Sequence, residues 1–196
     1  MPSISPAENL LAGLSDRQRE AVTHTDGPLL IVAGPGSGKT RVMAHRVAYL
    51  IGEKGVPAWK ILAVTFTNKA ARELRERCER LVGHGSDELQ VRTFHGFCSR
   101  VLRSDGEHVG LKPEFTIYDT DDQARVARRV LDEFDIDPKQ FPPRALLGII
   151  SDAKNNMRSP AQLERRTETY RDEVASRVYA AYEGALQRAN AVDFDD

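Results

Sequence analysis

The stretch Leu29-Leu30-Ile31-Val32-Ala33-Gly34-Pro35-Gly36-Ser37-Gly38-Lys39-Thr40 decides the fold, because an apolar run leads into a glycine-rich turn that ends in Gly-Lys-Thr. Glycines in such a turn let successive backbone N–H groups point at a polyphosphate, and the positive end of the following helix adds to the attraction. The run before the turn has the length of a buried strand, and apolar residues after it recur at helical spacing up to Ile51. We therefore predict a phosphate-binding loop between a strand and a helix.

Two residues at the end of this turn have chemical roles in such loops. Lys39 would reach the β- and γ-phosphates of ATP, and the Thr40 hydroxyl would take one position around Mg²⁺. We predict that these two residues are catalytic and that ATP and Mg²⁺ are the cofactors. The general pattern places a glycine where this chain has Ala33, a departure of one methyl group. The alternative is an ordinary glycine-rich turn in which the lysine falls by chance.

Composition restricts the classes of partner and compartment. The formal net charge of -1 predicts no general attraction to nucleic acid, so any such site must be a local patch or depend on stacking. Cys78 and Cys98 fall at apolar positions of helical patterns and are predicted to be reduced core residues. No apolar run approaches the length of a membrane span, and the first residues do not resemble a signal peptide. We expect a cytoplasmic protein with no membrane partner.

The pattern of secondary structure changes once along the chain. Up to about residue 103, the apolar runs 61–64 and 89–93 each precede an amphipathic helical segment, which predicts a parallel sheet of the α/β class. After about residue 119 only helical patterns remain. Helix starts are predicted from a capping box at Thr120–Gln123, from Pro143 in a first turn, and from Ser159 with Gln162. We therefore expect a helical subdomain after the α/β part.

Six motifs, in order and at similar spacing, make the chain resemble the UvrD/Rep/PcrA-type superfamily 1 DNA helicases from about residue 10 to its end. They are Leu14–Gln18, Ala33–Thr40, Thr65–Ala71, Thr93–Phe97, Ser151–Asn155 and Asp193–Asp196. The resemblance implies a RecA-like P-loop parallel sheet, incomplete in this chain, with an all-helical inserted subdomain. The implied domains are the first motor domain, called 1A, at 1–108, subdomain 1B at 109–189, and the start of a return to 1A at 190–196.

The resemblance also assigns a nucleotide site. Gln18 matches a glutamine that hydrogen-bonds the adenine edge through its two-sided amide, and Arg41 matches a position close to the nucleotide. Alone, Gln18 would be a solvated helix residue and Arg41 a surface arginine. The predicted ATP-binding residues are Gln18, Ala33, Gly34, Pro35, Gly36, Ser37, Gly38, Lys39, Thr40 and Arg41.

A DNA site is implied where the predicted strands end. An aromatic ring at Phe66 offers a stacking platform for an unpaired base, while Thr67, Asn68 and the helix N-terminus can hold a phosphate. The alternatives are a core phenylalanine at 66, a structural histidine at 95, and helix packing at Lys154. The predicted DNA-binding residues are Thr65, Phe66, Thr67, Asn68, Thr93, His95 and Lys154. The alternating arginines and glutamates from 72 to 80 predict a solvated helix face of paired charges, without a function.

ATP hydrolysis needs an acidic pair after an apolar strand, to hold Mg²⁺ and to activate water. No four-residue apolar run followed by Asp-Glu occurs after the loop, and residues 190–192 are not predicted to form a buried strand before Asp193–Asp196. We therefore expect the chain to stop inside the first motor domain, before the second motor domain, with bare sheet edges and a marginal fold.

These expectations combine into one predicted function. The chain would be the ATP-binding and single-stranded-DNA-binding N-terminal portion of a 3′-to-5′ ATP-dependent DNA helicase used in DNA repair and replication, acting on single strands and single/double-strand junctions. It would not be hydrolytically competent alone. The alternative is a non-catalytic module that binds nucleotide, DNA or a partner, and a small-molecule P-loop kinase is disfavoured by the DNA-like motifs.

Overall fold

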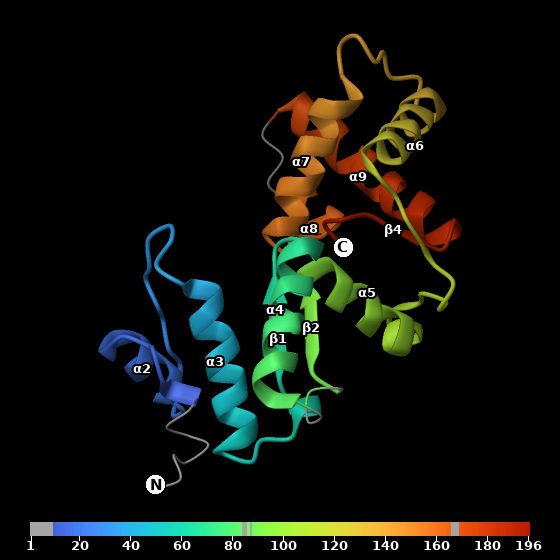
Figure 1. The fold of residues 1–196 in the computed structure, drawn as a ribbon. Coiled ribbons are helices and arrows are strands. Elements are labelled where there is room, and N and C mark those ends of the chain that lie inside the picture. The colour runs from blue at the N-terminus through green and yellow to red at the C-terminus, as the bar shows by residue number, and fades with distance from the viewer. Residues whose placement is uncertain (1–9, 84–85, 87, 166–168) are drawn as a thin grey trace, which may run out of the picture. The chain divides into compact units, whose positions relative to one another are not determined.

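The computed structural model describes residues 10–83, 86, 88–165 and 169–196 and divides into two compact units, 1–97 and 98–196. The predicted boundary at 108 stays a prediction. Helix α5 (Phe94–Asp105) crosses from one unit into the next (Figure 1). The other elements of the first unit are α2 (Asp16–Thr23), α3 (Lys39–Gly52), η1 (Ala58–Lys60), β1 (Leu62–Thr65), α4 (Asn68–Val82) and β2 (Gln90–Thr93). The second unit contains η3 (Gly106–Val109), β3 (Thr116–Ile117), α6 (Thr120–Glu133), α7 (Pro143–Asn155), α8 (Pro160–Glu164), α9 (Tyr170–Arg188) and β4 (Ala191–Val192).

A two-stranded parallel sheet forms the centre of the first unit, and both predicted strands are confirmed there. Strands β1 and β2 pair in a register that places Ala63 beside Val91. Both side chains are buried in a cluster with Leu74 and Cys78 of α4. Parallel strands need a crossover connection, and α4 supplies it. This part of the chain is therefore α/β, as predicted.

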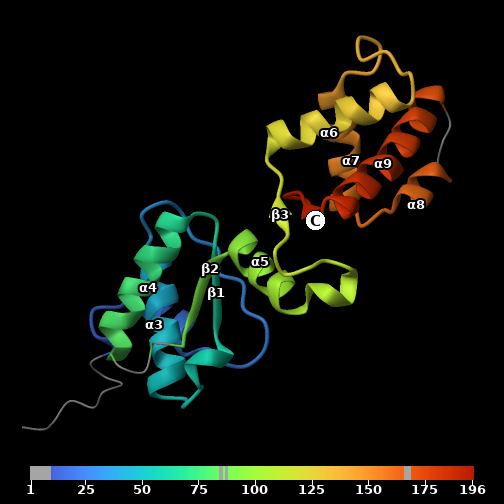
Figure 2. The ribbon, with the colours of Figure 1, turned by 90° about the vertical axis from the view of Figure 1, so that its right-hand side faces the viewer.

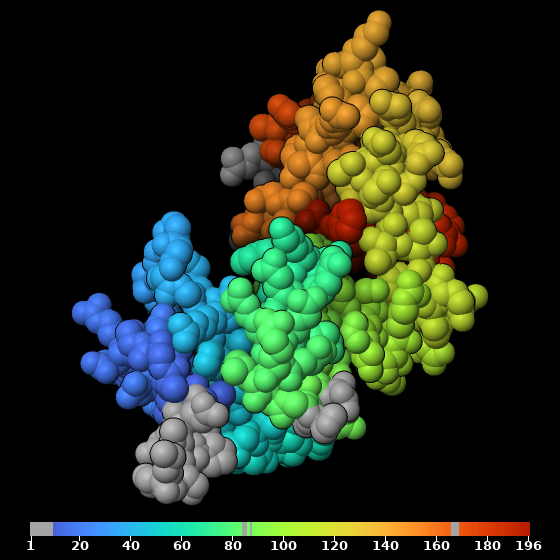
Figure 3. Space-filling model, viewed as in Figure 1, coloured from blue at the N-terminus to red at the C-terminus, as the bar shows by residue number. Residues whose placement is uncertain are grey.

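The predicted buried strand at Leu29–Val32 is wrong. These residues form no strand pairing, and Leu30 and Val32 are 87% and 89% exposed. A strand requires a neighbour for its backbone N–H and C=O groups, and among the described residues of the first unit only β1 and β2 form a sheet. Apolar composition alone therefore did not produce a strand. The blue atoms of this connection between α2 and α3 lie at the molecular surface in Figure 3.

Helices α6, α7 and α9 lie side by side in the second unit and enclose its core (Figure 2). The largest fully buried side chain in this core is Tyr182 of α9. The predicted starts at Pro143 and Ser159 are confirmed, but the capping box of α6 is one residue earlier than predicted. Asp119 caps the helix and pairs with Asp122. Its carboxylate accepts two backbone N–H groups, which a single hydroxyl at Thr120 does not do.

The chain end contains a short strand that the sequence analysis did not expect. Ala191 and Val192 form β4, both residues are buried, and β4 pairs in parallel with β3. The sequence analysis missed β4 because two residues are too few for a periodic pattern and because the partner strand lies far earlier in the chain. Cys78 is buried as predicted, but Cys98 is exposed, which corrects its assignment to the core. Within the described residues, no helix has both the length and the apolar character needed to cross a membrane.

Candidate nucleotide and nucleic-acid site

The glycine-rich loop adopts the backbone conformation that its sequence predicts. Gly36 and Gly38 have φ angles of 73° and 84°, in the left-handed region that favours glycine. Gly38 is also the N-cap of α3, so the loop leads directly into the positive end of a 14-residue helix. A Cβ atom added at Gly38 would lie 3.1 Å from Gln18 Nε2. The turn therefore depends on glycine both for its backbone angle and for the approach of Gln18.

The Lys39 ammonium group lies against this loop. Its Nζ donates to the carbonyl oxygens of Gly34 at 2.8 Å and Ala33 at 3.2 Å. The Ser37 hydroxyl also donates to Gly34 O, at 2.7 Å. Two neutral carbonyl groups thus hold the Lys39 ammonium group against the turn. An anion accepts stronger hydrogen bonds from an ammonium group and can replace these carbonyls as its partners.

Gln18 connects α2 to the same loop. Its Nε2 donates to Ser37 O at 3.1 Å, while its Oε1 accepts from the Ser15 backbone N–H in the capping box of α2. Both ends of the side-chain amide therefore have partners within the protein. Adenine recognition through this amide requires that at least one of these hydrogen bonds be exchanged for one to the base.

A cavity of about 530 Å³ opens beside the loop. Of the predicted ATP-binding residues, Gln18, Ala33, Gly34, Ser37 and Lys39 line it. The others, Pro35, Gly36, Gly38, Thr40 and Arg41, do not line it. Arg41 lines a separate cavity between α3 and α4, and its place close to the nucleotide stays a prediction.

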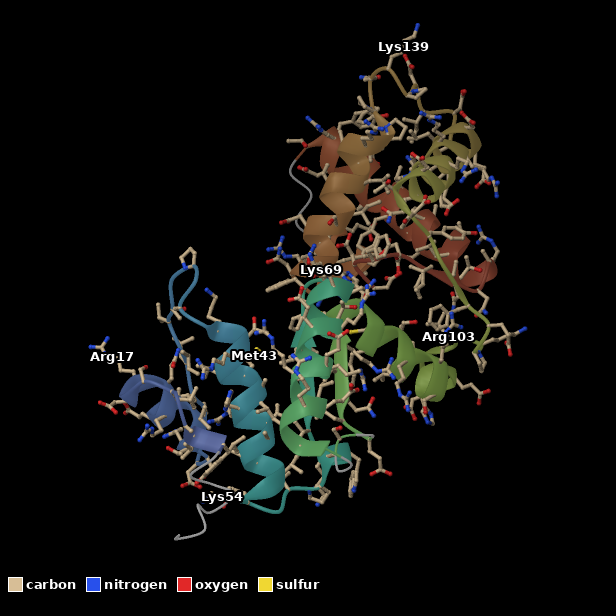
Figure 4. All side chains as sticks on the ribbon, in the orientation of Figure 1. Arg17, Met43, Lys54, Lys69, Arg103 and Lys139 are labelled. Carbon is tan, nitrogen blue, oxygen red and sulfur yellow. The ribbon has the colours of Figure 1, made fainter. Side chains whose placement is uncertain are left out.

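Eight lining residues of the loop cavity were not predicted to bind ATP, among them Arg17, Met43 and Arg46. Arg17 of α2 and Met43 of α3 are labelled in Figure 4. Arg46 donates to Ala21 O at 2.8 Å and to His24 O, and so joins α3 to the end of α2. Its position two helical turns after Lys39 was the signal that could have found it, because residues seven apart share a helix face.

The carboxyl ends of β1 and β2 carry an exposed aromatic pair. The strand register places Thr65 beside Thr93, and Phe66 and Phe94 follow these residues directly. Their ring centroids are 6.1 Å apart, and the rings are 92% and 51% exposed. The predicted alternative of a core phenylalanine at 66 is therefore wrong. Phe94 was missed, although its place after a strand matches that of Phe66.

Polar groups around these rings are organised by the starts of α4 and α5. The Thr67 hydroxyl accepts from the Ala70 N–H and caps α4, and the Thr65 hydroxyl donates to Thr67 O. The Thr93 hydroxyl accepts from the Gly96 N–H in the first turn of α5. Asn68 and His95 are exposed at the same helix starts. The structure thus brings together all the predicted DNA-binding residues except Lys154.

Lys154 lies in the second unit, within a buried cluster of charges. Its Nζ is 2.9 Å from Asp193, 2.6 Å from Asp196 and 2.8 Å from Glu183, and its side chain is 5% exposed. The Tyr182 hydroxyl donates to Asp193 at 2.9 Å. A lysine surrounded by three carboxylates presents little positive charge to a DNA phosphate. The alternative of a structural role fits these contacts, and we drop the phosphate contact.

The same cluster shifts the pKa values of the acidic residues near the chain end. Burial by itself would raise the pKa of Asp193, but the hydrogen bond and charge of Lys154, with the Tyr182 hydroxyl, hold that pKa below its usual value. Burial raises the pKa of Glu183, with partial compensation by Lys154. Asp193 is therefore a buried ion-pair partner. Among the described residues, no three His, Cys, Asp or Glu side chains are grouped so as to hold a metal ion.

A glycine-rich loop and an exposed aromatic pair on one α/β unit define a candidate nucleotide and nucleic-acid-binding protein. The family model described as UvrD/REP helicase N-terminal domain matches residues 14–196. The chain therefore belongs to the UvrD/REP helicase family, in its N-terminal domain.

Curated relatives agree with this assignment. The chain is 50% identical over 190 residues to the ATP-dependent DNA helicase PcrA of Bacillus subtilis, which covers 97% of this chain and 26% of the relative. It is 46% identical over 187 residues to PcrA of Staphylococcus aureus, covering 95% and 26%. PcrA of Leuconostoc citreum is 47% identical over 190 residues, covering 96% and 25%. The chain thus spans about a quarter of the length of these relatives.

Proposed function

We propose that this chain is the ATP-binding and single-stranded-DNA-binding N-terminal portion of a 3′-to-5′ ATP-dependent DNA helicase used in DNA repair and replication. One observation carries the proposal. Phe66, a large apolar side chain, stands 92% exposed beside Phe94 in the same unit as the glycine-rich loop. Exposing two aromatic rings to water costs free energy, and stacking against a flat apolar ligand removes that cost. Every unpaired base offers such a flat face.

For ATP, the proposed holders are the loop residues Ala33 to Thr40 together with Gln18 and Arg41. Left-handed Gly36 and Gly38 shape the turn, and Lys39 already lies across it. Thr40 follows Lys39 in the first turn of α3, where its hydroxyl could serve as one oxygen ligand of Mg²⁺. When bound, Mg²⁺ would offset the negative charge of the phosphates.

For DNA, the proposed contacts are the rings of Phe66 and Phe94 and the polar groups at Thr65, Thr67, Asn68, Thr93 and His95. Stacking on the rings would be independent of base sequence, while the helix N-termini of α4 and α5 favour the nearby phosphates. Single-stranded DNA, and the single strand beside a junction, fit this surface because paired bases do not expose their faces.

Replacing Phe66 with alanine tests the stacking contact. We expect the Phe66→Ala variant to bind a labelled oligothymidylate about 5- to 100-fold more weakly, because stacking on one ring is worth about 1–3 kcal/mol per base. The loss should be the same at each salt concentration, since no charge is removed. Fluorescence anisotropy, repeated at several salt concentrations, measures the affinity and its dependence on salt.

Trp59→Ala is the matched control for this test. Trp59 is 59% exposed and precedes β1, so it lies at the opposite end of the sheet from Phe66. Its removal should leave DNA affinity unchanged. Equal affinities of the Phe66→Ala variant and the unsubstituted chain would refute the stacking role, and equal losses in both variants would indicate nonspecific aromatic binding.

The second candidate function is a module that binds nucleotide, DNA or a partner without turnover. The exposed apolar segment Leu29–Val32, beside the loop itself, favours it because such a segment is suited to contact another chain. Steady-state ATP hydrolysis tests the expectation, shared by both functions, that this chain alone does not turn over ATP. We expect no stimulation of turnover by single-stranded DNA, since the sequence contains no four-residue apolar run followed by Asp-Glu after the loop. A DNA-stimulated rate would show that this chain is catalytically complete.

A further inference from the structure

Helix α2, which carries Gln18, has little core of its own to hold it in place. It contains eight residues, fewer than an isolated helix needs to be stable in water, and Val22 is its one buried residue. Val22 packs with Leu14 and Val42 in a cluster of three buried residues. Helices α2 and α3 lie side by side (Figure 1). The position of α2 beside the glycine-rich loop therefore depends on its interactions with α3.

The end of α2 requires partners for its backbone carbonyl groups. The last four carbonyls of a helix have no N–H partner within it, and they form the negative end of the helix dipole. The last turn, Glu20–Thr23, contains no lysine or arginine that could offset this charge. Arg46 of α3 supplies the cation. Its Nη1 donates to Ala21 O at 2.8 Å and to the carbonyl oxygen of His24, the residue that caps α2.

This contact lies close to Gln18. Ala21 follows Gln18 by three residues, so the two lie on the same face of α2. Gln18, Ala21 and Arg46 all line the cavity of about 530 Å³ beside the loop. Helix α2 is thus joined to the rest of the site at two points, by Gln18 to Ser37 O at 3.1 Å and by Arg46 to Ala21 O.

The two connections respond differently to a bound base. Gln18 must release the backbone of Ser15 or of Ser37 before its amide can hydrogen-bond adenine. The Arg46 donors face no such exchange, because their acceptors are backbone carbonyls at the end of α2. When Gln18 turns to the base, Arg46 is therefore the connection that keeps α2 in place.

We propose that Arg46 is a positioning residue for nucleotide recognition, which anchors α2 to α3 so that the Gln18 amide stays within hydrogen-bond distance of the base. This inference deepens the proposed function and rests on it. It divides the site into two parts. Phosphate binding depends on the loop and Lys39, whereas base binding depends on α2 and hence on Arg46.

The test measures two affinities of the full chain by isothermal titration calorimetry with Mg²⁺. One ligand is a nonhydrolysable ATP analogue, and the other is inorganic triphosphate, which has no base. The Arg46→Met variant keeps most of the side-chain stem but no donor. We expect it to bind the analogue about 3- to 10-fold more weakly, as for the loss of one hydrogen bond, and to bind triphosphate as tightly as before. Arg46→Lys, which keeps a cationic donor, should recover part of the loss.

A double-variant cycle with Gln18→Ala separates positioning from a general loss of stability. Gln18→Ala should itself weaken binding of the analogue, and adding Arg46→Met should weaken it no further, because Arg46 acts through Gln18. Arg75→Met is the matched control. Arg75 of α4 donates to Val91 O at 3.2 Å in the same unit and does not line the loop cavity. Its removal should leave both affinities unchanged.

Three results would overturn the role of Arg46 alone. The first is unchanged affinity of the Arg46→Met variant for the analogue. The second is an equal loss for the analogue and for triphosphate, which would indicate a phosphate contact or a damaged loop. The third is additive losses in the double variant. If the unsubstituted chain bound neither ligand, the proposed nucleotide site itself would be refuted, and the inference with it.

Discussion

The Lys154→Met variant is expected to lower the free energy of unfolding of the helical unit by about 3–5 kcal/mol, because removal of one partner leaves buried charge without compensation. The Lys154 ammonium group contacts three carboxylates, of which Asp193 has a side chain only 3% exposed. Methionine has a similar volume, so the variant removes the charge while it keeps most of the packing.

Chemical denaturation of the full chain, followed by far-UV circular dichroism, measures this loss. Fluorescence of Trp59, the single tryptophan, follows the unfolding of the first unit separately. The substitution should change that unfolding transition little. Lys139→Met is the control, because Lys139 is an exposed lysine that lies between α6 and α7 (Figure 4). A loss below about 1 kcal/mol in the Lys154→Met variant would contradict a structural role and reopen the question of a DNA contact.

The second large effect is expected at the glycine-rich loop. Lys39→Ala should weaken ATP binding by about 10- to 100-fold, since a hydrogen bond to a charged group contributes about 1.5–3 kcal/mol. The Lys39 ammonium group is within hydrogen-bond distance of two loop carbonyls, at the edge of the cavity that also contains Gln18. Its loss removes the cation next to the place proposed for the phosphates. Isothermal titration calorimetry with a nonhydrolysable ATP analogue and Mg²⁺ gives the affinity.

Lys54→Ala serves as the control for Lys39→Ala. Lys54 follows the other end of α3, where its ammonium group lies 5.8 Å from the ring centroid of Tyr49 (Figure 4). It carries the same charge but does not line the loop cavity. If both variants bound the analogue as tightly as the unsubstituted chain, the loop would have no role in nucleotide binding.

Local signals in the sequence predicted most of the individual elements. The apolar runs at 61–64 and 89–93 became β1 and β2, and helix signals at Pro143 and Ser159 marked true starts. Left-handed glycines in the loop were also predictable, because the requirement lies within the turn itself. These features depend on residues within a few positions of one another, so the order of residues was sufficient.

Tertiary structure alone decided the pairing of distant segments. Leu29–Val32 has the composition of a strand but finds no neighbouring strand among the described residues, whereas the unpromising pair Ala191–Val192 is a strand because β3 lies beside it. Lys154 and Asp193 are 39 residues apart, and only folding showed that they neutralise each other. The motifs determined which family the chain belongs to. The packing of distant residues determined which side chains remain accessible to a ligand, because exposure and charge compensation arise only when those residues meet in space.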